Sequence, residues 1–367
     1  MADRSAKDEI TRRRFVKGAA VGIGGAALVG LGALQACSKK ETASTGTGSA
    51  GSKESITWRM QSYYPHTNST AGRLHWEWAR GITEVTGGRL KVECNEPNSI
   101  VPAGDIFQNV ADGTLDAGGT FGPVYRGLMP EADIEAGLPF AWERIEELQA
   151  GFYKYGLLEE FRKIYAEHNI FYATPIYVNV MYGFPTIRPV RKPSDFKGMK
   201  IRDLGLSADW VAHFGAVPTS LPPGEVYMAL KMNTIQGVHF GTSILDELKI
   251  GEVCKYYLLY PNTGKCNCNV LINMKAYNAL PEDLKKIVKD YSINFTLPAA
   301  VDVDELRYFI EARKKYKIEE VRWSQKDIEE SRAFMIEKLW PKAAAKSERC
   351  KKLVDIVYNQ VKLLGKV

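Results

Sequence analysis

Hydrophobic and polar positions follow two different periodicities along the first half of the folded chain, one typical of helices and one typical of strands. Leu74, Trp78 and Ile82 recur at helical spacing, whereas the residues around Trp58 and Val92 alternate as strands do. These patterns predict, in order, a strand at 56–60, a helix at 69–85, a strand at 89–94, a helix at 105–113 and a short strand at 115–120. A β-α-β-α-β order indicates right-handed crossovers and a parallel sheet.

The second half repeats this alternation and then becomes helical. The predicted elements are a long amphipathic helix at 146–168, a β-rich run at 171–182, a strand ending on Arg202, a helix at 206–214, a strand at 217–219, a helix at 223–232, strands at 235–240 and 270–273, and almost continuous helix from 281 to the end. We therefore expect an α/β, two-lobed binding-protein fold with a ligand cleft and long C-terminal helices. The first lobe is predicted at 55–178 plus 268–305, and the second lobe with the helical tail at 179–267 plus 306–367.

The first 37 residues have the pattern of an export signal. Basic residues around Arg12 and Arg13 precede an uncharged stretch at 18–34 that is too short and glycine-rich for a spanning helix. The paired arginines resemble a twin-arginine signal, which carries folded proteins. The ending at Cys37 resembles a lipobox and predicts lipidation of that cysteine, although Gln35 is unusual there and ordinary cleavage is the alternative. Residues 38–54 are rich in Ser, Thr and Gly and are expected to form a flexible tether. We thus predict a periplasmic, or otherwise extracytoplasmic, protein anchored to the membrane by lipid.

The net charge bears on the expected partners, and the cysteines bear on the expected disulfide bonds. Removal of residues 1–37 lowers the net charge from +6 to +3, and no dense basic patch follows, so nucleic acid is not an expected partner. Five cysteines remain in the mature chain: Cys94, Cys254, Cys266, Cys268 and Cys350. We expect small buried thiols, with a Cys254–Cys266 disulfide as the alternative.

No familiar catalytic motif occurs in the sequence. The five histidines form none of the usual metal-binding spacings, and there is no nucleophile elbow, phosphate-binding loop or dinucleotide fingerprint. We therefore expect a binding protein without a cofactor, and not an enzyme. An enzyme with scattered catalytic residues remains the alternative.

Several blocks of sequence resemble one family of binding proteins. Residues 196–202 (FKGMKIR), 217–219 (VPT), 223–230 (PGEVYMAL) and 233–238 (NTIQGV) match its core, and 113–117 (GTLDA) and 272–274 (INM) agree with its first lobe. The chain resembles the DctP-like solute-binding proteins of tripartite ATP-independent periplasmic (TRAP) transporters, particularly the subgroup for 2-oxo acids and other monocarboxylates. The resemblance implies capture of an organic acid and its delivery to TRAP membrane permease subunits. A receptor of an ATP-driven (ABC) transporter is the alternative binding protein.

The resemblance assigns the ligand carboxylate to Arg202. A guanidinium presents a planar fork of donors that matches a carboxylate, and strand ends facing a cleft are common ligand sites. The alternative is a surface arginine paired with Asp203 or Asp209. In the 2-oxo-acid subgroup, the positions that match His239 and Phe240 resemble a Glu-Trp pair. The resemblance implies that this glutamate helps to hold a metal ion.

The changed residues at these positions alter the expected recognition. A second acidic metal ligand is also missing near 262–264, so we expect no metal and direct binding of the anion by Arg202 with His239. Phe240 is expected to form an apolar wall of the cleft.

Weaker candidates complete the predicted site. Tyr63, Tyr64, Asn179, Tyr182, Asn267 and Asn269 lie near strand ends or lobe crossings, whereas Asp246 and Glu247 are expected on a solvated helix. The helical stretch at 295–318 permits a homodimer, as in some relatives with a long C-terminal helix. The sequence does not identify the organic acid.

Overall fold

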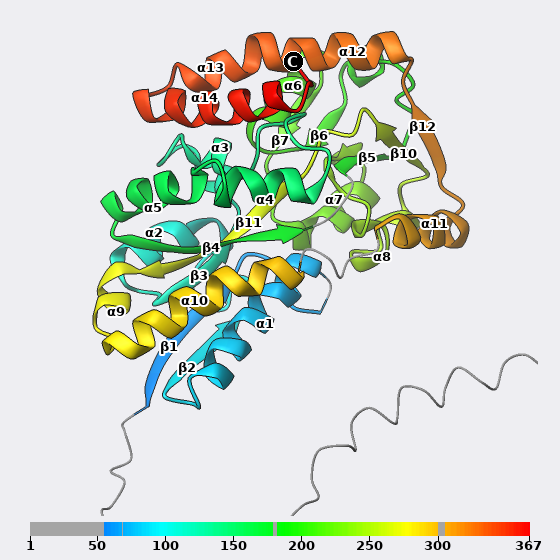
Figure 1. The fold of residues 1–367 in the computed structure, drawn as a ribbon. Helices are drawn as coiled ribbons and strands as arrows, with labels where there is room; N and C mark the ends of the chain where they lie inside the picture. Colours follow the sequence, from blue (N-terminus) through cyan, green and yellow to red (C-terminus); the bar gives the residue numbers. More distant parts are fainter. Residues whose placement is uncertain (1–54, 68, 179–181, 300–304) are drawn as a thin grey trace, which may run out of the picture. The chain divides into compact units, whose positions relative to one another are not determined.

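The computed structural model describes residues 55–67, 69–178, 182–299 and 305–367. The predicted export signal, the tether, Cys37 and Asn179 lie outside these residues. The described chain contains two β-sheets with helices around them, which confirms the predicted mixed α/β architecture (Figure 1).

The first sheet has five strands in the order β2-β1-β3-β11-β4. Strand β1 pairs in parallel with β2 and β3, as the sequence pattern predicts, whereas β11 is antiparallel to both β3 and β4. The elements are β1 (Ile56–Ser62), α1 (Thr70–Val85), β2 (Leu90–Asn95), α2 (Ile106–Asp112), β3 (Ala117–Thr120), α3 (Ala132–Glu135), α4 (Ile145–Tyr153), α5 (Leu157–Glu167), β4 (Ile170–Val178), β11 (Cys266–Asn273), α9 (Met274–Asn278) and α10 (Glu282–Ala299). We call this sheet and its helices the first lobe.

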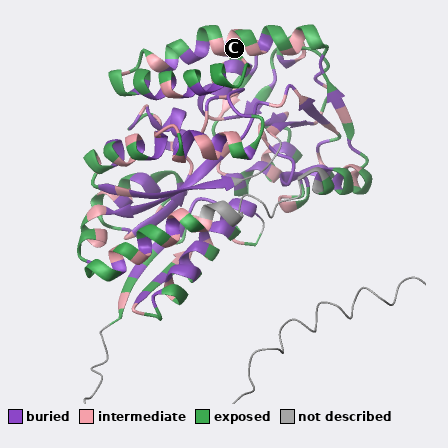
Figure 2. Ribbon diagram, in the orientation of Figure 1, coloured by how far each residue is buried: buried purple, intermediate pink, exposed green. Residues whose placement is uncertain are grey.

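Helix α1 illustrates how the sequence builds this lobe. The hydroxyl of Ser69 accepts a hydrogen bond from the backbone N–H of Gly72 and caps the helix. Leu74, Trp78 and Ile82 then form a buried stripe one turn apart. Helices α1 and α10 lie on one side of the sheet and α2 and α5 on the other (Figure 1), so buried residues line both faces of the strands (Figure 2).

The second sheet has seven strands. Six follow the order β12-β10-β5-β8-β6-β7, and β9 pairs with β5 outside that path. Its elements are β5 (Tyr182–Thr186), β6 (Lys200–Arg202), α6 (Gly205–His213), β7 (Val217–Thr219), α7 (Val226–Lys231), β8 (Gly237–Val238), β9 (Phe240–Gly241), α8 (Ile244–Glu247), β10 (Tyr256–Tyr260), α11 (Glu305–Tyr316) and β12 (Glu319–Arg322). We call this sheet and its helices the second lobe.

Three local predictions differ from the structure. The helix predicted at 146–168 is two helices, because Gly156 adopts a φ of +91° between α4 and α5 and breaks the helical path. The strand predicted at 235–240 is divided into β8 and β9. Strand β12 interrupts the predicted helical tail, because it finds a parallel partner in β10.

The C-terminal helices form a layer that contacts the first lobe. Helix α12 (Gln325–Phe334) continues through a π-helical turn (Met335–Leu339) into α13 (Trp340–Ala344), and α14 (Glu348–Leu363) follows. Helix α14 contacts α3, α4 and α5. The side-chain carbonyl of Gln360 accepts a hydrogen bond from the buried indole of Trp142 at 3.0 Å, which ties this helix to the first lobe.

The end of β6 positions the central residue of the predicted site. Ile201 and Arg202 pair in parallel with β7 on one side and β8 on the other. The chain then turns at Gly205, whose φ of +67° leads into α6. A Cβ atom at Gly205 would lie 3.0 Å from Asp133 Oδ1 of the first lobe, so the absent side chain permits a close approach of the lobes.

Candidate functional site

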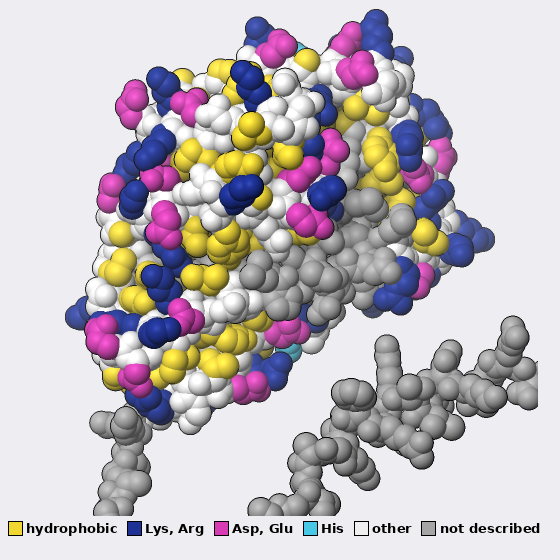
Figure 3. Space-filling view, viewed as in Figure 1, with side chains coloured by type: hydrophobic (Ala, Val, Ile, Leu, Met, Phe, Trp, Pro, Cys, Tyr) yellow, Lys and Arg dark blue, Asp and Glu magenta, His cyan; other side chains and the backbone are white. Residues whose placement is uncertain are grey.

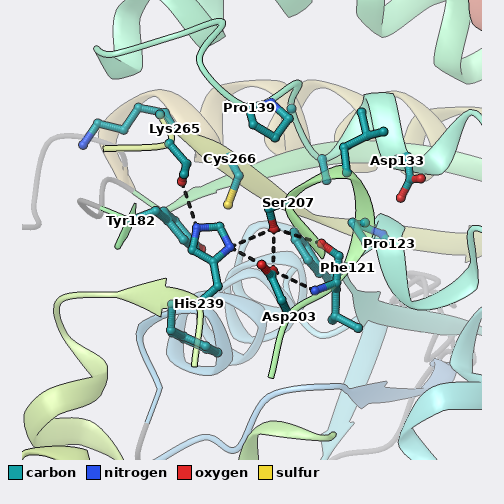
Figure 4. A pocket seen from close by; sticks show the side chains of 18 of the residues that line it. Phe121, Pro123, Asp133, Pro139, Tyr182, Asp203, Ser207, His239, Lys265 and Cys266 are labelled. Carbon is teal, nitrogen blue, oxygen red and sulfur yellow. Dashed lines mark hydrogen bonds and ion pairs between the residues drawn. The ribbon is translucent and has the colours of Figure 1, made fainter. Parts of the chain in front are cut away.

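A small cavity of about 70 Å³ lies where the two lobes meet (Figure 4). Its wall combines residues that are distant in sequence. They are Tyr64, Phe121, Pro123, Asp133, Ala136, Gly137 and Pro139 from the first lobe, Tyr182 and residues 202–207 with His239 and Phe240 from the second, and residues 263–266 from the segment that leads into β11. Of the residues that the sequence offers as ligand contacts, the structure places Arg202, His239, Phe240, Tyr64 and Tyr182 on this wall.

Arg202 is a buried cation in this wall, with only 4% of its surface exposed. Its Nε donates to the backbone carbonyl of Leu221 at 3.0 Å, and its guanidinium lies 5.5 Å from the ring centre of Phe240. The guanidinium is also near enough to the hydroxyl of Tyr63 to oppose the rise in the pKa of that residue. These contacts fix the orientation of the side chain without neutralising its charge.

The sequence left Asp203 and Asp209 as possible ion-pair partners of Arg202, and neither of them forms an ion pair with it. Asp203 contacts His239, and Asp209 lies 3.9 Å from Arg126. Among the described residues, Arg202 forms no ion pair with any carboxylate. A buried charge normally requires a partner, and among the described residues this cation has no carboxylate to serve as one.

Tyr63 supports Arg202 from the first lobe. Burial raises the pKa of Tyr63, while the charge and hydrogen bond of Arg202 act in the opposite direction. Its ring also packs edge-on against Tyr64, with the ring centres 5.0 Å apart. The structure therefore places Tyr63 behind the cavity wall and beside the guanidinium, rather than among the lining residues.

His239 has hydrogen-bond partners at both ring nitrogens. Nδ1 lies 3.0 Å from Asp203 Oδ1 and 2.9 Å from Ser207 Oγ, and Nε2 lies 2.8 Å from Thr263 Oγ1. Because the carboxylate of Asp203 only accepts, Nδ1 carries a proton, and in the neutral ring Nε2 accepts from Thr263. Figure 4 shows this network across the middle of the cavity.

Aromatic rings hold the His239 side chain from two sides. The ring stacks on Phe184 with the centres 4.6 Å apart and meets Tyr182 edge-on at 5.6 Å. Burial raises the pKa of Tyr182 well above its ordinary value, so its hydroxyl stays neutral. The arrangement gives the cavity a rigid aromatic wall with a few directed polar groups, as is typical of small-molecule sites.

Several wall residues were not predicted from the sequence. Asp203, Ser207 and Thr263 share the network of His239, and Asp133 reaches the wall from α3. Asp203 directly follows Arg202, and this proximity was a signal available in the sequence. Thr263 and Asp133 gave no comparable signal, because only the folded chain brings them beside β6.

A second polar cluster lies behind the cavity, in the core of the first lobe. Glu135 Oε1 accepts from the hydroxyl of Tyr172 at 2.5 Å and from Nδ2 of Asn267 at 2.7 Å, and Oε2 accepts from Nδ2 of Asn269 at 3.2 Å. Burial raises the pKa of Glu135 to about 8, and the hydrogen bonds oppose this shift. Asn267 and Asn269, weaker candidates for ligand contact, thus contact this buried carboxyl group.

The two lobes also meet at a contact away from Arg202. The hydroxyl of Thr70 in α1 donates to Glu247 Oε1 in α8 at 2.5 Å, and Arg73 lies 3.5 Å from the same carboxylate. The expectation that Glu247 sits on a solvated face is therefore wrong, because the first lobe covers it. Asp246 instead contacts Lys315 and Tyr316 within the second lobe.

We expect Glu247→Ala to weaken ligand binding about fivefold through faster dissociation, because one charged hydrogen bond of the closed state is lost. Stopped-flow measurement of the dissociation rate checks this. Asp246→Ala is the matched control, since it removes a neighbouring carboxylate that does not join the lobes. Equal dissociation rates in the wild type and Glu247→Ala would contradict a role in closure.

The cysteine side chains in the described part of the chain form no disulfide. The five cysteines after residue 37 are free. Cys254, Cys268 and Cys350 are buried, as expected, whereas Cys94 and Cys266 are partly exposed. Among the described residues, no three or more His, Cys, Asp or Glu side chains gather in a way that would hold a metal ion. Within the same residues, no helix combines the length and the apolar character needed to cross a membrane.

Two α/β lobes with a cavity where they meet are the architecture of two-lobed solute-binding proteins. Residues 62–346 match the sequence profile of the bacterial extracellular solute-binding protein family 7, DctP. The chain therefore belongs to this family, and the resemblance to the DctP-like solute-binding proteins of TRAP transporters is confirmed.

Two relatives are similar to the chain in sequence, and a solved structure is similar to it in fold. A monocarboxylate 2-oxoacid-binding periplasmic protein of Nostoc sp. PCC 7120 is 27% identical over 277 residues, 75% of this chain and 74% of the relative. An ectoine/5-hydroxyectoine-binding periplasmic protein of Ruegeria pomeroyi is 26% identical over 244 residues, 62% of this chain and 71% of the relative. A TRAP periplasmic solute-binding protein of Pseudoalteromonas atlantica, solved with sodium and pyruvate, has a TM-score of 0.78 at 22% identity, covering 85% of this chain and 95% of that one.

Proposed function

We propose that this protein is an extracytoplasmic receptor that captures the carboxylate of a small organic acid through Arg202 and delivers the acid to a TRAP-type membrane permease. Export by the twin-arginine route and a lipid anchor at Cys37 belong to the same proposal. The lobes open to admit the acid, close around it, and present the closed form to the permease.

The observation that carries this proposal is the buried guanidinium of Arg202 without a carboxylate partner among the described residues. A carboxylate ligand would neutralise this charge and accept hydrogen bonds from the guanidinium nitrogens that the Leu221 carbonyl leaves available. The 2-oxo-acid binding of the Nostoc relative and the pyruvate in the Pseudoalteromonas structure support a small carboxylate. Family membership favours a TRAP permease over an ATP-driven transporter.

One feature of the cavity favours an enzyme as the second candidate. Asp203, His239 and Thr263 are linked in the order of an acid, a base and a hydroxyl nucleophile. The backbone N–H groups beside Thr263, however, already donate within the protein: Gly264 to Asn262 Oδ1, and Lys265 to the carbonyl of Trp142. These two donors are therefore not available to an oxyanion, which makes binding a better fit to this geometry than acyl transfer.

Calorimetry of the purified protein with a panel of small organic acids tests the proposal directly. We expect one-to-one binding of at least one acid and its unchanged recovery after prolonged incubation, as shown by mass spectrometry. Chemical conversion of a bound acid that disappears in Thr263→Ala would favour the enzyme. Absence of binding by every acid in the panel would overturn the receptor.

We also expect the affinity for the acid to be independent of Na⁺ and Ca²⁺. Among the described residues, no three or more His, Cys, Asp or Glu side chains gather in a way that would hold an ion, and both ring nitrogens of His239 already have partners in Asp203 and Thr263. Titrations after treatment with a chelator, repeated in sodium-free buffer and then with each ion restored, check this. A rise in affinity on restoring either ion would mean that a cation takes part in the site.

A further inference from the structure

The carboxylate of Asp203 is satisfied on one oxygen and not on the other. Oδ1 receives the backbone N–H of Leu204 at 2.8 Å, the hydroxyl of Ser207, and Nδ1 of His239 at 3.0 Å. Oδ2 is buried and has no hydrogen-bond partner among the described residues. Asp203 is only 4% exposed, so solvent does not replace the missing donor.

In Asp133, on the facing wall, one carboxylate oxygen likewise has partners and the other has none among the described residues. Lys346 and Arg126 approach its Oδ2, at 3.2 and 3.4 Å, whereas Oδ1 is buried without a partner among the described residues. The side chain is fully buried, and Oδ1 lies beside Gly205 at the start of α6. Figure 4 shows Asp203 and Asp133 as parts of the wall of one cavity, contributed by different lobes.

A buried carboxylate oxygen without a donor is costly, and two of them around one cavity indicate a ligand that supplies donors. An oxo acid cannot do this, because its carboxylate and its carbonyl only accept hydrogen bonds. A hydroxyl, ammonium or amide N–H group can. The cavity therefore offers two kinds of recognition: a cation, Arg202, for a carboxylate, and bare acceptors for a donor group.

We infer that the ligand carries a hydrogen-bond donor in addition to its carboxylate, and that this donor pairs with the free oxygen of Asp203 or Asp133. The inference rests on the proposed function and names its ligand class as small hydroxy or amino acids rather than simple oxo acids. The cavity is small, about 70 Å³, which favours compact acids. Both oxygens are buried where the lobes meet, so the donor has to enter while the lobes are apart, before they close around the ligand.

Matched pairs of acids test the inference, because a hydroxyl and a carbonyl oxygen differ little in size. Calorimetry compares pyruvate with lactate and alanine, and 4-oxopentanoate with 4-hydroxypentanoate, using both enantiomers of the chiral acids. We expect the donor-bearing member of at least one set to bind at least about tenfold more tightly than its oxo partner. This comparison uses the wild-type protein and does not depend on any variant folding.

Two conservative variants locate the effect. Asp203→Asn and Asp133→Asn each turn an acceptor oxygen into a site that can present an N–H donor, so at least one should reduce the preference to within about threefold or reverse it. Asp246→Asn is the matched control, since Asp246 lies in the same lobe as Asp203 but contacts Lys315 and Tyr316 away from the cavity wall. It should leave the preference unchanged.

Equal or tighter binding of the oxo acid in every set would overturn the inference, as would a donor preference that survives both variants. An affinity that rises with Na⁺ or Ca²⁺ would overturn it too, because a cation would then occupy the free oxygens. In all three cases the proposed receptor function stands, provided that binding still requires Arg202. If no acid binds the wild type, the proposed function itself fails, and the inference fails with it.

Discussion

Arg202→Ala is expected to abolish organic acid binding, lowering the affinity at least about 100-fold. The substitution removes the buried guanidinium and every hydrogen bond that it offers to a carboxylate. The acid would then have to bury its charge without a counter-ion, which costs more than the lost contacts alone. Calorimetry with the tightest acid of the panel measures the effect.

The ligand-free variant should remain folded. In the wild type, Arg202 is desolvated without a paired carboxylate among the described residues, so its removal relieves an electrostatic cost while losing the contacts with Leu221 and Phe240. Arg191→Ala is the matched control, because Arg191 lies in the second lobe and pairs with Glu319 at the surface. Wild-type affinity in Arg202→Ala, with the fold intact, would exclude Arg202 as the carboxylate ligand.

The second large effect is expected in the dependence of stability on pH. Burial raises the pKa of Glu135 to about 8 from an ordinary value near 4.5, so the folded protein holds this proton over a range in which the unfolded chain releases it. Stability should therefore fall as the pH rises from about 4.5 to about 8, by at most about 5 kcal/mol. The contribution is complete below this range and lost above it.

Glu135→Gln should remove this fall, because the amide is neutral at every pH in the window. The measurement is the free energy of unfolding by denaturant at closely spaced pH values, taken as the difference between the wild type and the variant. The difference cancels His75, whose pKa burial lowers to about 3 and whose stabilising effect disappears as the pH falls below about 6.5. Glu84→Gln, on the exposed face of α1, is the control, and a flat difference curve for Glu135→Gln would show that the buried carboxyl group does not titrate in this range.

The elements that the sequence predicts well are those with strong local periodicity. Helix α1 and the parallel start of the first sheet follow directly from the spacing of Trp78, Ile82 and their neighbours. The break at Gly156 was missed because the hydrophobic spacing continues through it, although the glycine itself was visible. Strand β12 was missed because its pairing with β10 lies more than 50 residues away in the chain.

In the candidate site, too, contiguous sequence blocks suggested some residues, whereas other contacts appear only in the folded chain. Arg202 was identifiable because it closes a short strand within a characteristic block of residues, and His239 and Phe240 because they follow another such block. The contact of Asp203 with His239, and not with Arg202, could not be predicted from the sequence. It depends on the opposite directions of successive side chains at the end of β6 and on the position of Ser207 in α6. The covering of Glu247 by Thr70 required both lobes to be placed.

By itself, the sequence determined the α/β class and the family, and it predicted Arg202 as the residue that binds a carboxylate. These depend on local spacing and on blocks of residues that are contiguous in the chain. Only the tertiary structure decided that Arg202 lacks a carboxylate partner among the described residues, and that Asp203 and Asp133 share a cavity wall. Burial and the absence of a counter-ion are properties of the space around a side chain, and segments distant in sequence fill that space only when the chain folds.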